Sequence, residues 1–386
     1  MYSFVLVGLS AFLIALFLTP LCRNLCLRLG CVDQPDDRRK LHSRPIPRVG
    51  GVVIIAASFA SIGVLALSLP QGGRGVTEAA PLAWRLIPAV LVVFATGLLD
   101  DLVTLRPWQK LVGEFAAAVL ACWGGVHLHF ATYALPLWLS IPLTIFWLIG
   151  CTNAFNLIDG VDGLATGVGL FATLTTLVAA LMQGNFGLAI ATVALAGALL
   201  GFLRYNFNPA TIFLGDCGSL SVGFLLGCYG VIWSQKTITM LGMTAPLMAL
   251  AIPLLDTGLA IARRVLRRQP IFTGDRGHIH HRLLDRGLTP RHVALLLYAV
   301  CGVAAGFSLL LSVTDSQITG LVVILFCTAA WLGVQHLGYV EFNLAGRLIL
   351  PGTFLRVLNA QLLLRTLEDN LKAAETAAEC WSIIRA

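Results

Sequence analysis

Residues 134–182 read ALPLWLSIPLTIFWLIGCTNAFNLIDGVDGLATGVGLFATLTTLVAALM, two apolar runs joined by a short polar segment. Each run is close to the length of about 20 residues that a helix needs to cross the hydrocarbon layer of a membrane. A segment in lipid must satisfy its own backbone hydrogen bonds, so both runs are expected to be transmembrane helices. The polar segment between them then lies at a membrane surface.

Similar runs fill most of the chain. Hydrophobic residues make up 58% of the 386 residues, charged residues 12%, and the mean hydropathy is +0.86, which is far from the composition of an average soluble protein. The first run lacks a basic segment before it and leads directly into the fold, so we expect a span and not a cleavable signal peptide. We predict an all-α, polytopic integral membrane protein with about eleven spans, at 4–22, 50–70, 83–99, 111–130, 134–152, 164–182, 184–203, 217–235, 238–262, 293–313 and 317–340.

Basic residues set the expected orientation. We number the loops between the predicted spans in chain order. Of the 26 Lys and Arg residues, the even-numbered loops carry only Arg74, Arg85 and Lys236. The positive-inside rule therefore places the N-terminus outside and the C-terminus in the cytosol. The net charge of +7 follows from this topology. Nucleic acid is not an expected partner, because no basic module interleaved with aromatic residues occurs.

The chain divides into a membrane-embedded domain, 1–340, and a cytosolic tail, 341–386. The tail has apolar positions near helical spacing, which fits an amphipathic surface helix; a flexible or partner-binding extension is the open alternative. The ten Cys residues are scattered, mostly in apolar runs, and are interpreted as small buried hydrophobic residues.

Polar clusters punctuate the apolar chain, all on the predicted cytosolic side. Asp100 and Asp101 end the third span. Neighbouring residues on a helix point about 100° apart, so both can address one site only at a frayed helix end. Acids at a helix C-terminus also oppose the macrodipole, which favours a functional pair over solvated caps. Lys110 opens the next span and is expected to reach the same pocket; a snorkelling lysine is the alternative.

Residues 153–163 read NAFNLIDGVDG, with a polar group at every third position. These groups cannot share one face of a regular helix, but the glycines would let the helix break and the groups converge. Amide and carboxylate oxygens suit Mg²⁺ bound with phosphate. A simple N-cap explains one of the acids but not the whole set, which consists of Asn153, Asn156, Asp159 and Asp162.

Residues 213–219, FLGDCGS, place Asp216 between glycines at a predicted helix start. An ordinary N-cap would explain Asp216 alone. Glycines also let backbone N–H groups approach a phosphate, and beside the other clusters Asp216 is a candidate metal ligand.

Residues 274–282 read GDRGHIHHR and gather three of the eight His residues. A zinc site is one interpretation, but no partner Cys set is evident. An anion-binding loop is favoured, because arginines flank the histidines. Glu114 and Asp256 lie inside apolar runs, where ionisable residues are functional or paired. We expect a structural role for Glu114, whereas Asp256 follows Pro253 and is expected to border the pocket.

Taken together, these segments resemble the polyprenyl-phosphate N-acetylhexosamine-1-phosphate transferases of glycosyltransferase family 4. The matching segments occur in the order of the family and cover about 1–340. They are KLHSRPIPRVGG at 40–51, GLLDDLVTLRPWQK at 97–110, and the segments 153–163, 213–219 and 274–282.

The resemblance implies an enzyme of the bacterial inner membrane with its active site on the cytosolic face. It would transfer an N-acetylhexosamine-1-phosphate, by default GlcNAc-1-phosphate, from a UDP-sugar to undecaprenyl or another polyprenyl phosphate. UMP would be released, and a lipid-linked glycan of the cell envelope would be started. The implied cofactor is Mg²⁺, with Mn²⁺ as a substitute, and the implied partners are both substrates and membrane lipid.

The resemblance also assigns roles. Asp216 and Asn156 would hold the metal. Asp100, supported by Asp101, would deprotonate or orient the lipid phosphate, and Asp159 is placed with them as catalytic. The expected substrate-binding residues are Lys40, Lys110, Asn153, Asp162, His278, His280, His281 and Arg282.

Several alternatives stay open at this point. A transporter or flippase would also contain many spans with acidic residues, although its site should lie near the middle of the membrane. A catalytically silent scaffold is the other rival class. The identity of the sugar, the length of the polyprenol, the glycan pathway and the oligomeric state, including a homodimer, are open. Direct displacement is our hypothesis for the mechanism, against a two-step route through a covalent aspartyl intermediate.

Overall fold

The computed structural model describes residues 2–33, 45–68, 74–129, 135–235, 243–266, 269, 277–313, 316–336 and 381. The chain forms two compact units, Met1–Ala329 and Ala330–Ala386. The predicted domain boundary at residue 340 stays a prediction, because the tail after it lies outside the described residues apart from Trp381.

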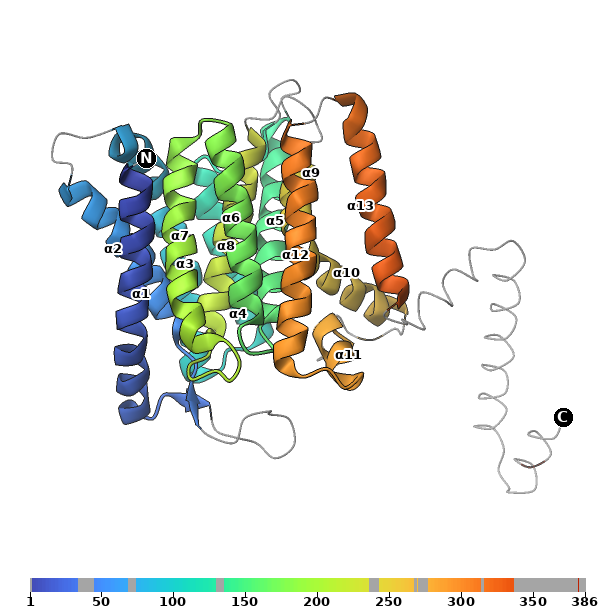
Figure 1. Cartoon of the computed structure of the whole chain (residues 1–386), viewed down its shortest axis with the longest axis horizontal. Helices are drawn as coiled ribbons and strands as arrows, with labels where there is room; N and C mark the ends of the chain where they lie inside the picture. The colour runs from blue at the N-terminus through green and yellow to red at the C-terminus, as the bar shows by residue number, and fades with distance from the viewer. Residues whose placement is uncertain are drawn as a thin grey trace. The chain divides into compact units, whose positions relative to one another are not determined.

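Nearly all described residues belong to helices (Figure 1). The elements in chain order are α1 Tyr2–Leu29, β1 Val32–Asp33, β2 Ile46–Pro47, α2 Gly50–Ser68, α3 Arg74–Val103, α4 Pro107–Trp123, α5 Leu137–Ile158, α6 Leu164–Met182, α7 Phe186–Asn206, α8 Gly215–Gln235, α9 Thr244–Ala249, α10 Ala251–Leu266, α11 Ile279–Asp285, α12 Pro290–Val313 and α13 Ser316–His336. The two strands pair antiparallel, with Val32 opposite Pro47 and Asp33 opposite Ile46.

Among the described helices, eight are long and apolar enough to cross a membrane. They are α1, α2, the Pro81–Val103 part of α3, α5, α6, α7, α8 and the Pro290–Leu311 part of α12. The predicted class, an all-α multi-pass membrane protein, is confirmed. The number of eleven spans and their orientation stay predictions.

The three further predicted spans differ from the other eight. The helix α4 has 17 residues, and the apolar part of α13 that is described runs over Gly320–His336. The predicted span 238–262 consists of two short helices, α9 and α10, which meet at Leu250. Pro253 lies in the first turn of α10, where its missing N–H group costs no hydrogen bond within the helix, so the sequence is compatible with a new helix beginning there.

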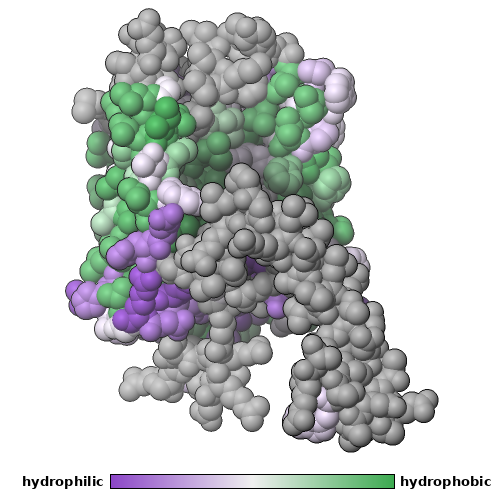
Figure 2. All heavy atoms as spheres, turned by 90° about the vertical axis from the view of Figure 1, so that its right-hand side faces the viewer, coloured by the Kyte–Doolittle hydropathy of each residue, from purple (hydrophilic) through white to green (hydrophobic). Residues whose placement is uncertain are grey.

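Helix α8 forms the centre of the first unit. All of its apolar window is buried, and α2, α3, α5 and α6 pack around it. A helix that is apolar on every side is expected in such a core position. On the face shown in Figure 2, apolar side chains cover the upper and middle parts of the described surface, and hydrophilic side chains gather at its lower left.

The start of α8 is tied to the loop before α2. Pro47 accepts a hydrogen bond from the Phe213 amide at 2.8 Å, Gly50 donates to the Phe213 carbonyl at 3.0 Å, and Gly51 donates to the Leu214 carbonyl at 3.0 Å. These backbone bonds bring residues 47–51 and 213–214, far apart in sequence, to the same end of the helical bundle.

Candidate active site

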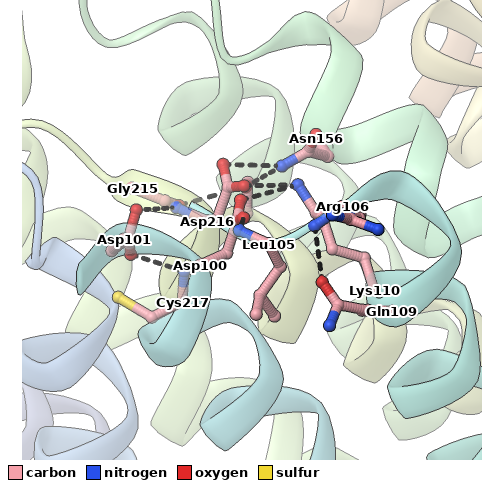
Figure 3. A network of polar contacts seen from close by, with 11 residues as sticks. Asp100, Asp101, Leu105, Arg106, Gln109, Lys110, Asn156, Gly215, Asp216 and Cys217 are labelled. Atoms are coloured by element: carbon pink, nitrogen blue, oxygen red, sulfur yellow. Dashed lines mark hydrogen bonds and ion pairs between the residues drawn. The ribbon is translucent and has the colours of Figure 1, made fainter. Parts of the chain in front are cut away.

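The turn between α3 and α4 places the first acid and the lysine. The chain reverses at Thr104, which adopts a positive φ of 55°. Asp100 Oδ1 accepts a hydrogen bond from the Leu105 amide at 2.6 Å and so holds the turn closed. Pro107 begins α4 at a position suited to proline. Lys110 is therefore carried back toward Asp100, and its Nζ lies 2.9 Å from Asp100 Oδ2 (Figure 3).

Lys110 also joins the third acidic segment. Its Nζ lies 2.5 Å from Asp216 Oδ2, at the start of α8. The other oxygen of Asp216 accepts a hydrogen bond from Asn156 Nδ2 at 3.0 Å, and the same nitrogen donates to Ser219 Oγ at 3.0 Å. Residues from α3, α4, α5 and α8 thus form one network (Figure 3). The side chains of Asp100, Lys110 and Asp216 keep 12%, 20% and 16% of their surface exposed, so this network is only partly closed to solvent.

Asp101 points away from Asp100 and has a different environment. Its Oδ1 accepts from the Asp216 amide at 2.8 Å and its Oδ2 from the Cys217 amide at 2.9 Å. The helix α3 is not frayed here but continues to Val103. The acidic pair therefore does not address one point: Asp100 contacts Lys110, whereas Asp101 caps the first turn of α8.

Close packing of α3 on α8 makes this cap possible. A Cβ atom at Gly97 would lie 2.5 Å from the Asp216 carbonyl oxygen and 2.6 Å from Cys217 Cα. Since real side chains do not approach that closely, only glycine lets the two helices come together one turn before Asp101. The sequence segment 97–110 thus contains a packing residue as well as its polar residues.

The helix between Asn153 and Asp162 breaks as predicted, but its four polar groups do not converge on one point. Asn153 donates to the carboxylate of Glu114 and, at 3.0 Å, to the Ile149 carbonyl. Glu114 is 1% exposed, so this pair is a buried link between α4 and α5, in line with the structural role expected for Glu114. Only Asn156 of the four bonds to Asp216.

Asp162 and Asp159 occupy the turn between α5 and α6. Asp162 Oδ2 accepts from Asn208 Nδ2 at 2.9 Å and from the Ala210 amide at 3.0 Å, which fixes this turn to the loop before α8. Asp159 follows the last residue of α5. Burial and the nearby carboxylate of Asp216 raise the pKa of Asp159 well above its ordinary value, and Arg48 opposes this rise.

Arg48 is a charged residue of the site that was not singled out from the sequence, although it belongs to the segment 40–51. It pairs with Asp33 at 3.4 Å. Burial lowers the pKa of Arg48, but the carboxylates of Asp33, Asp101, Asp216 and Asp159 outweigh burial and hold the pKa above its ordinary value. Arg48 is therefore a permanent cation beside the acids.

The histidines approach the site from α11. His278 Nδ1 lies 2.9 Å from Asp256 Oδ2, and both side chains are buried. His280 is 2% exposed, and its Nε2 would lie 2.7 Å from a Cβ atom at Gly160, so the imidazole rests on the turn beside Asp159. Burial, followed by the neighbouring His281, lowers the pKa of His280 to about 3, so His280 is neutral at physiological pH.

The remaining predicted site residues lie as follows. His281 and Arg282 are half-buried in α11, next to His280. Lys40 lies outside the described residues. The structure thus brings Asp100, Lys110, Asn156 and Asp216 together. It sets His280 on the turn beside Asp159. Asp101, Asn153 and Asp162 form hydrogen bonds that organise the backbone and the helix packing. Their roles in chemistry stay predictions.

The donor set can be compared with the needs of a magnesium ion. Within the described ranges, no group of three or more His, Cys, Asp and Glu side chains is arranged to hold a metal ion. Mg²⁺ in phosphate-handling sites, however, uses one or two carboxylates and completes its shell with water and substrate phosphates. Asp216 supplies one such carboxylate, and Asn156 supplies an amide oxygen, because its nitrogen is used for Asp216 and Ser219. Lys110 and Asn156 bind the two oxygens of Asp216, so an ion held there would replace at least one of these contacts.

Comparison with known proteins agrees with the class of fold and site. The family model described as glycosyl transferase family 4 matches residues 83–234, which contain the network of Figure 3. The chain is 34% identical over 308 residues to a probable undecaprenyl-phosphate N-acetylglucosaminyl 1-phosphate transferase of Bacillus subtilis, covering 78% of this chain and 82% of that protein.

Two further relatives are informative. A decaprenyl-phosphate N-acetylglucosaminephosphotransferase of Mycolicibacterium smegmatis is 34% identical over 334 residues, 78% of this chain and 80% of that protein. A phospho-N-acetylmuramoyl-pentapeptide-transferase of Listeria welshimeri is 32% identical over 228 residues, 53% of this chain and 67% of that protein. The chain is thus a multi-pass membrane protein, and it belongs to glycosyl transferase family 4, as its sequence segments predict.

Proposed function

We propose that this protein transfers N-acetylglucosamine-1-phosphate from UDP-N-acetylglucosamine to a polyprenyl phosphate and releases UMP. The observation that carries the proposal is the network in which Lys110 bridges Asp100 and Asp216, with Asn156 on the other side of Asp216. Such a set of a cation and oxygen donors suits the transfer of a phosphoryl group. The names of the relatives support the same reaction.

The reaction needs positioning and charge neutralisation more than covalent chemistry. An oxygen of the lipid phosphate attacks the phosphorus that carries the sugar, and the bond from this phosphorus to the UMP oxygen breaks. Asp100 holds or accepts a proton of the lipid phosphate. Lys110 donates to the phosphate oxygens, and Arg48 supplies a further positive charge at the edge of the site.

Asp216 and Asn156 would hold Mg²⁺. The bound ion would neutralise the charge on the diphosphate oxygens. Asp101 keeps Asp216 in place through the backbone of α8. The neutral imidazole of His280 rests beside Asp159 and is available to the sugar diphosphate, together with His281.

We propose further that the site lies on the cytosolic side of the bacterial inner membrane. The basic loops favour that orientation, UDP-sugars are cytosolic, and a lipid phosphate reaches the interface while its chain stays among the helices. Transfer at that face would start a lipid-linked glycan of the cell envelope.

The test uses purified full-length protein with Mg²⁺, a short polyprenyl phosphate and a panel of UDP-sugars, with products read by mass spectrometry. UMP and a polyprenyl diphosphate-GlcNAc are expected, and both should be lost with EDTA or in Asp216→Ala. Turnover that persists after complete metal removal would contradict the magnesium part of the proposal. Substrate uptake into vesicles without release of UMP would instead identify a transporter. A phosphorylated protein formed with UDP-sugar alone would contradict direct displacement.

A further inference from the structure

Asp256 is a buried acid of α10 that lies outside the lysine–carboxylate network. It is 1% exposed and uses both oxygens on a segment more than twenty residues away in sequence. Its Oδ1 accepts a hydrogen bond from the Ile279 amide at 2.8 Å, and its Oδ2 lies 2.9 Å from His278 Nδ1. One carboxylate therefore holds both the side chain of His278 and the backbone of the next residue.

The chemistry of these groups fixes the proton on the imidazole. An amide N–H can only donate, so Asp256 Oδ1 is an acceptor, and an ionised carboxylate accepts at both oxygens. With Asp256 as the ionised acceptor at both oxygens, the 2.9 Å contact gives His278 Nδ1 the proton and the donor role. Nε2, on the opposite side of the ring, is left for another partner. An aspartate that orients a histidine in this way selects its tautomer.

The ring of His278 lies beside the other two histidines. It stacks parallel to the ring of His280, with centroids 5.7 Å apart and planes 5° apart. The rings of His280 and His281 are 4.3 Å apart, and His280 Nε2 rests on Gly160, beside Asp159. A rotation of the His278 ring would therefore disturb the whole histidine cluster at its contact with the site.

We propose that Asp256 is a positioning residue for the transfer reaction, which fixes His278 with its proton on Nδ1 and thereby sets the three histidines against the sugar diphosphate. The inference rests on the proposed function, in which these histidines contact substrate. The competing explanation is a purely structural one, in which Asp256 only binds the Ile279 amide at the start of α11.

Asp256→Asn separates the two explanations. The side-chain oxygen of the asparagine still accepts from the Ile279 amide, so the backbone contact is retained. The side-chain NH₂ group, however, now faces His278 Nδ1 and forces this nitrogen to become an acceptor, which moves the proton to Nε2. Asp256→Ala removes both contacts. Asp285→Asn makes the same change of charge on an exposed residue of α11 and is the matched control.

The experiment measures kcat and KM for UDP-N-acetylglucosamine at saturating lipid phosphate. Asp256→Asn should lower kcat at least about tenfold, as expected when an orienting hydrogen bond is lost, while Asp285→Asn stays near wild type. In a His278→Asn background, Asp256→Asn should have less than about a twofold further effect, because residues that act through one another are not additive.

Two outcomes would overturn the inference. Wild-type kcat in Asp256→Asn, with a loss in Asp256→Ala, would leave only the structural contact. An undiminished effect of Asp256→Asn in the His278→Asn background would show that Asp256 acts elsewhere.

A spectroscopic measurement keeps the inference testable if Asp256→Asn does not fold. In ¹⁵N spectra of histidine-labelled wild-type protein, the His278 signal is assigned by its absence in His278→Asn, and Nδ1 should be protonated at neutral pH. An unprotonated Nδ1 would refute the inference. Absence of UMP release from the wild type would contradict the proposed function instead, because the spectrum does not depend on turnover.

Discussion

Asp101 offers the sharpest test of how the site is held together, because its two oxygens bind two amides at the start of α8. In Asp101→Asn, the side-chain oxygen can keep one of these bonds, but the NH₂ group faces the other N–H group. The variant also removes the favourable interaction between the negative charge of Asp101 and the positive end of the α8 macrodipole. The change is therefore local, nearly isosteric and directed at one backbone contact.

The magnitude follows from those contacts. A hydrogen bond to a charged group contributes about 1.5–3 kcal/mol, and the charge at a helix N-terminus about 0.3–1 kcal/mol. Asp101→Asn should therefore lower the free energy of unfolding by about 2–4 kcal/mol. Asp100→Asn is the matched comparison. Its side-chain oxygen can keep the bond from the Leu105 amide, its pair with Lys110 is partly exposed, and Lys110 keeps Asp216. The stability cost of this variant should therefore stay below about 1 kcal/mol.

The assay is unfolding of the purified protein in mixed micelles by increasing denaturing detergent, followed by circular dichroism, beside UMP release. Asp101→Asn should lose both stability and turnover, whereas Asp100→Asn should lose turnover with little change in stability. If Asp101→Asn abolished turnover and left the unfolding free energy within about 0.5 kcal/mol of wild type, Asp101 would act on substrate directly. The explanation of Asp101 as a cap would then be wrong.

Three further predictions concern the elements around this network. Gly160→Ala should lower kcat about tenfold, because the new Cβ would displace the His280 ring. The control is Gly150→Ala, where a new Cβ meets nothing within 4 Å and turnover should stay at the wild-type level. Equal turnover in both variants would refute the importance of the contact between Gly160 and His280. Glu114→Leu and Asn153→Leu should each cost about 1–3 kcal/mol in the same unfolding assay, because each breaks the buried hydrogen bond between the two side chains. The double variant should cost less than the sum of the two, and strict additivity would argue against the pair. The pKa of His280 is about 3 in the fold and about 6.5 in the unfolded chain. The unfolded state therefore binds a proton that the folded state does not, so the free energy of unfolding falls as the pH drops below about 6.5. Between pH 7 and 5.5 the loss from this group should be about 1.3 kcal/mol, and it should be absent in His280→Gln; an unchanged pH dependence in that variant would contradict the burial of a neutral imidazole.

The sequence by itself determined the class of the protein. Runs of apolar residues near membrane length require helices, because lipid offers no partner for backbone hydrogen bonds. The glycines at 160 and 163 also predicted that the helix breaks within 153–163, and the segment 213–219 predicted that Asp216 lies at the start of a helix. Each of these features depends on neighbouring residues only.

Tertiary structure decided which polar groups meet. Spacing along a helix gives the direction of a side chain but not the neighbour that it meets, so Asn153 and Asn156, three residues apart, contact different helices. The same limit hid the opposite orientations of Asp100 and Asp101, because the cap of α8 exists only where Gly97 lets two helices touch. A hydrogen bond between groups more than a hundred residues apart requires the packing of the whole bundle, which local sequence patterns do not contain.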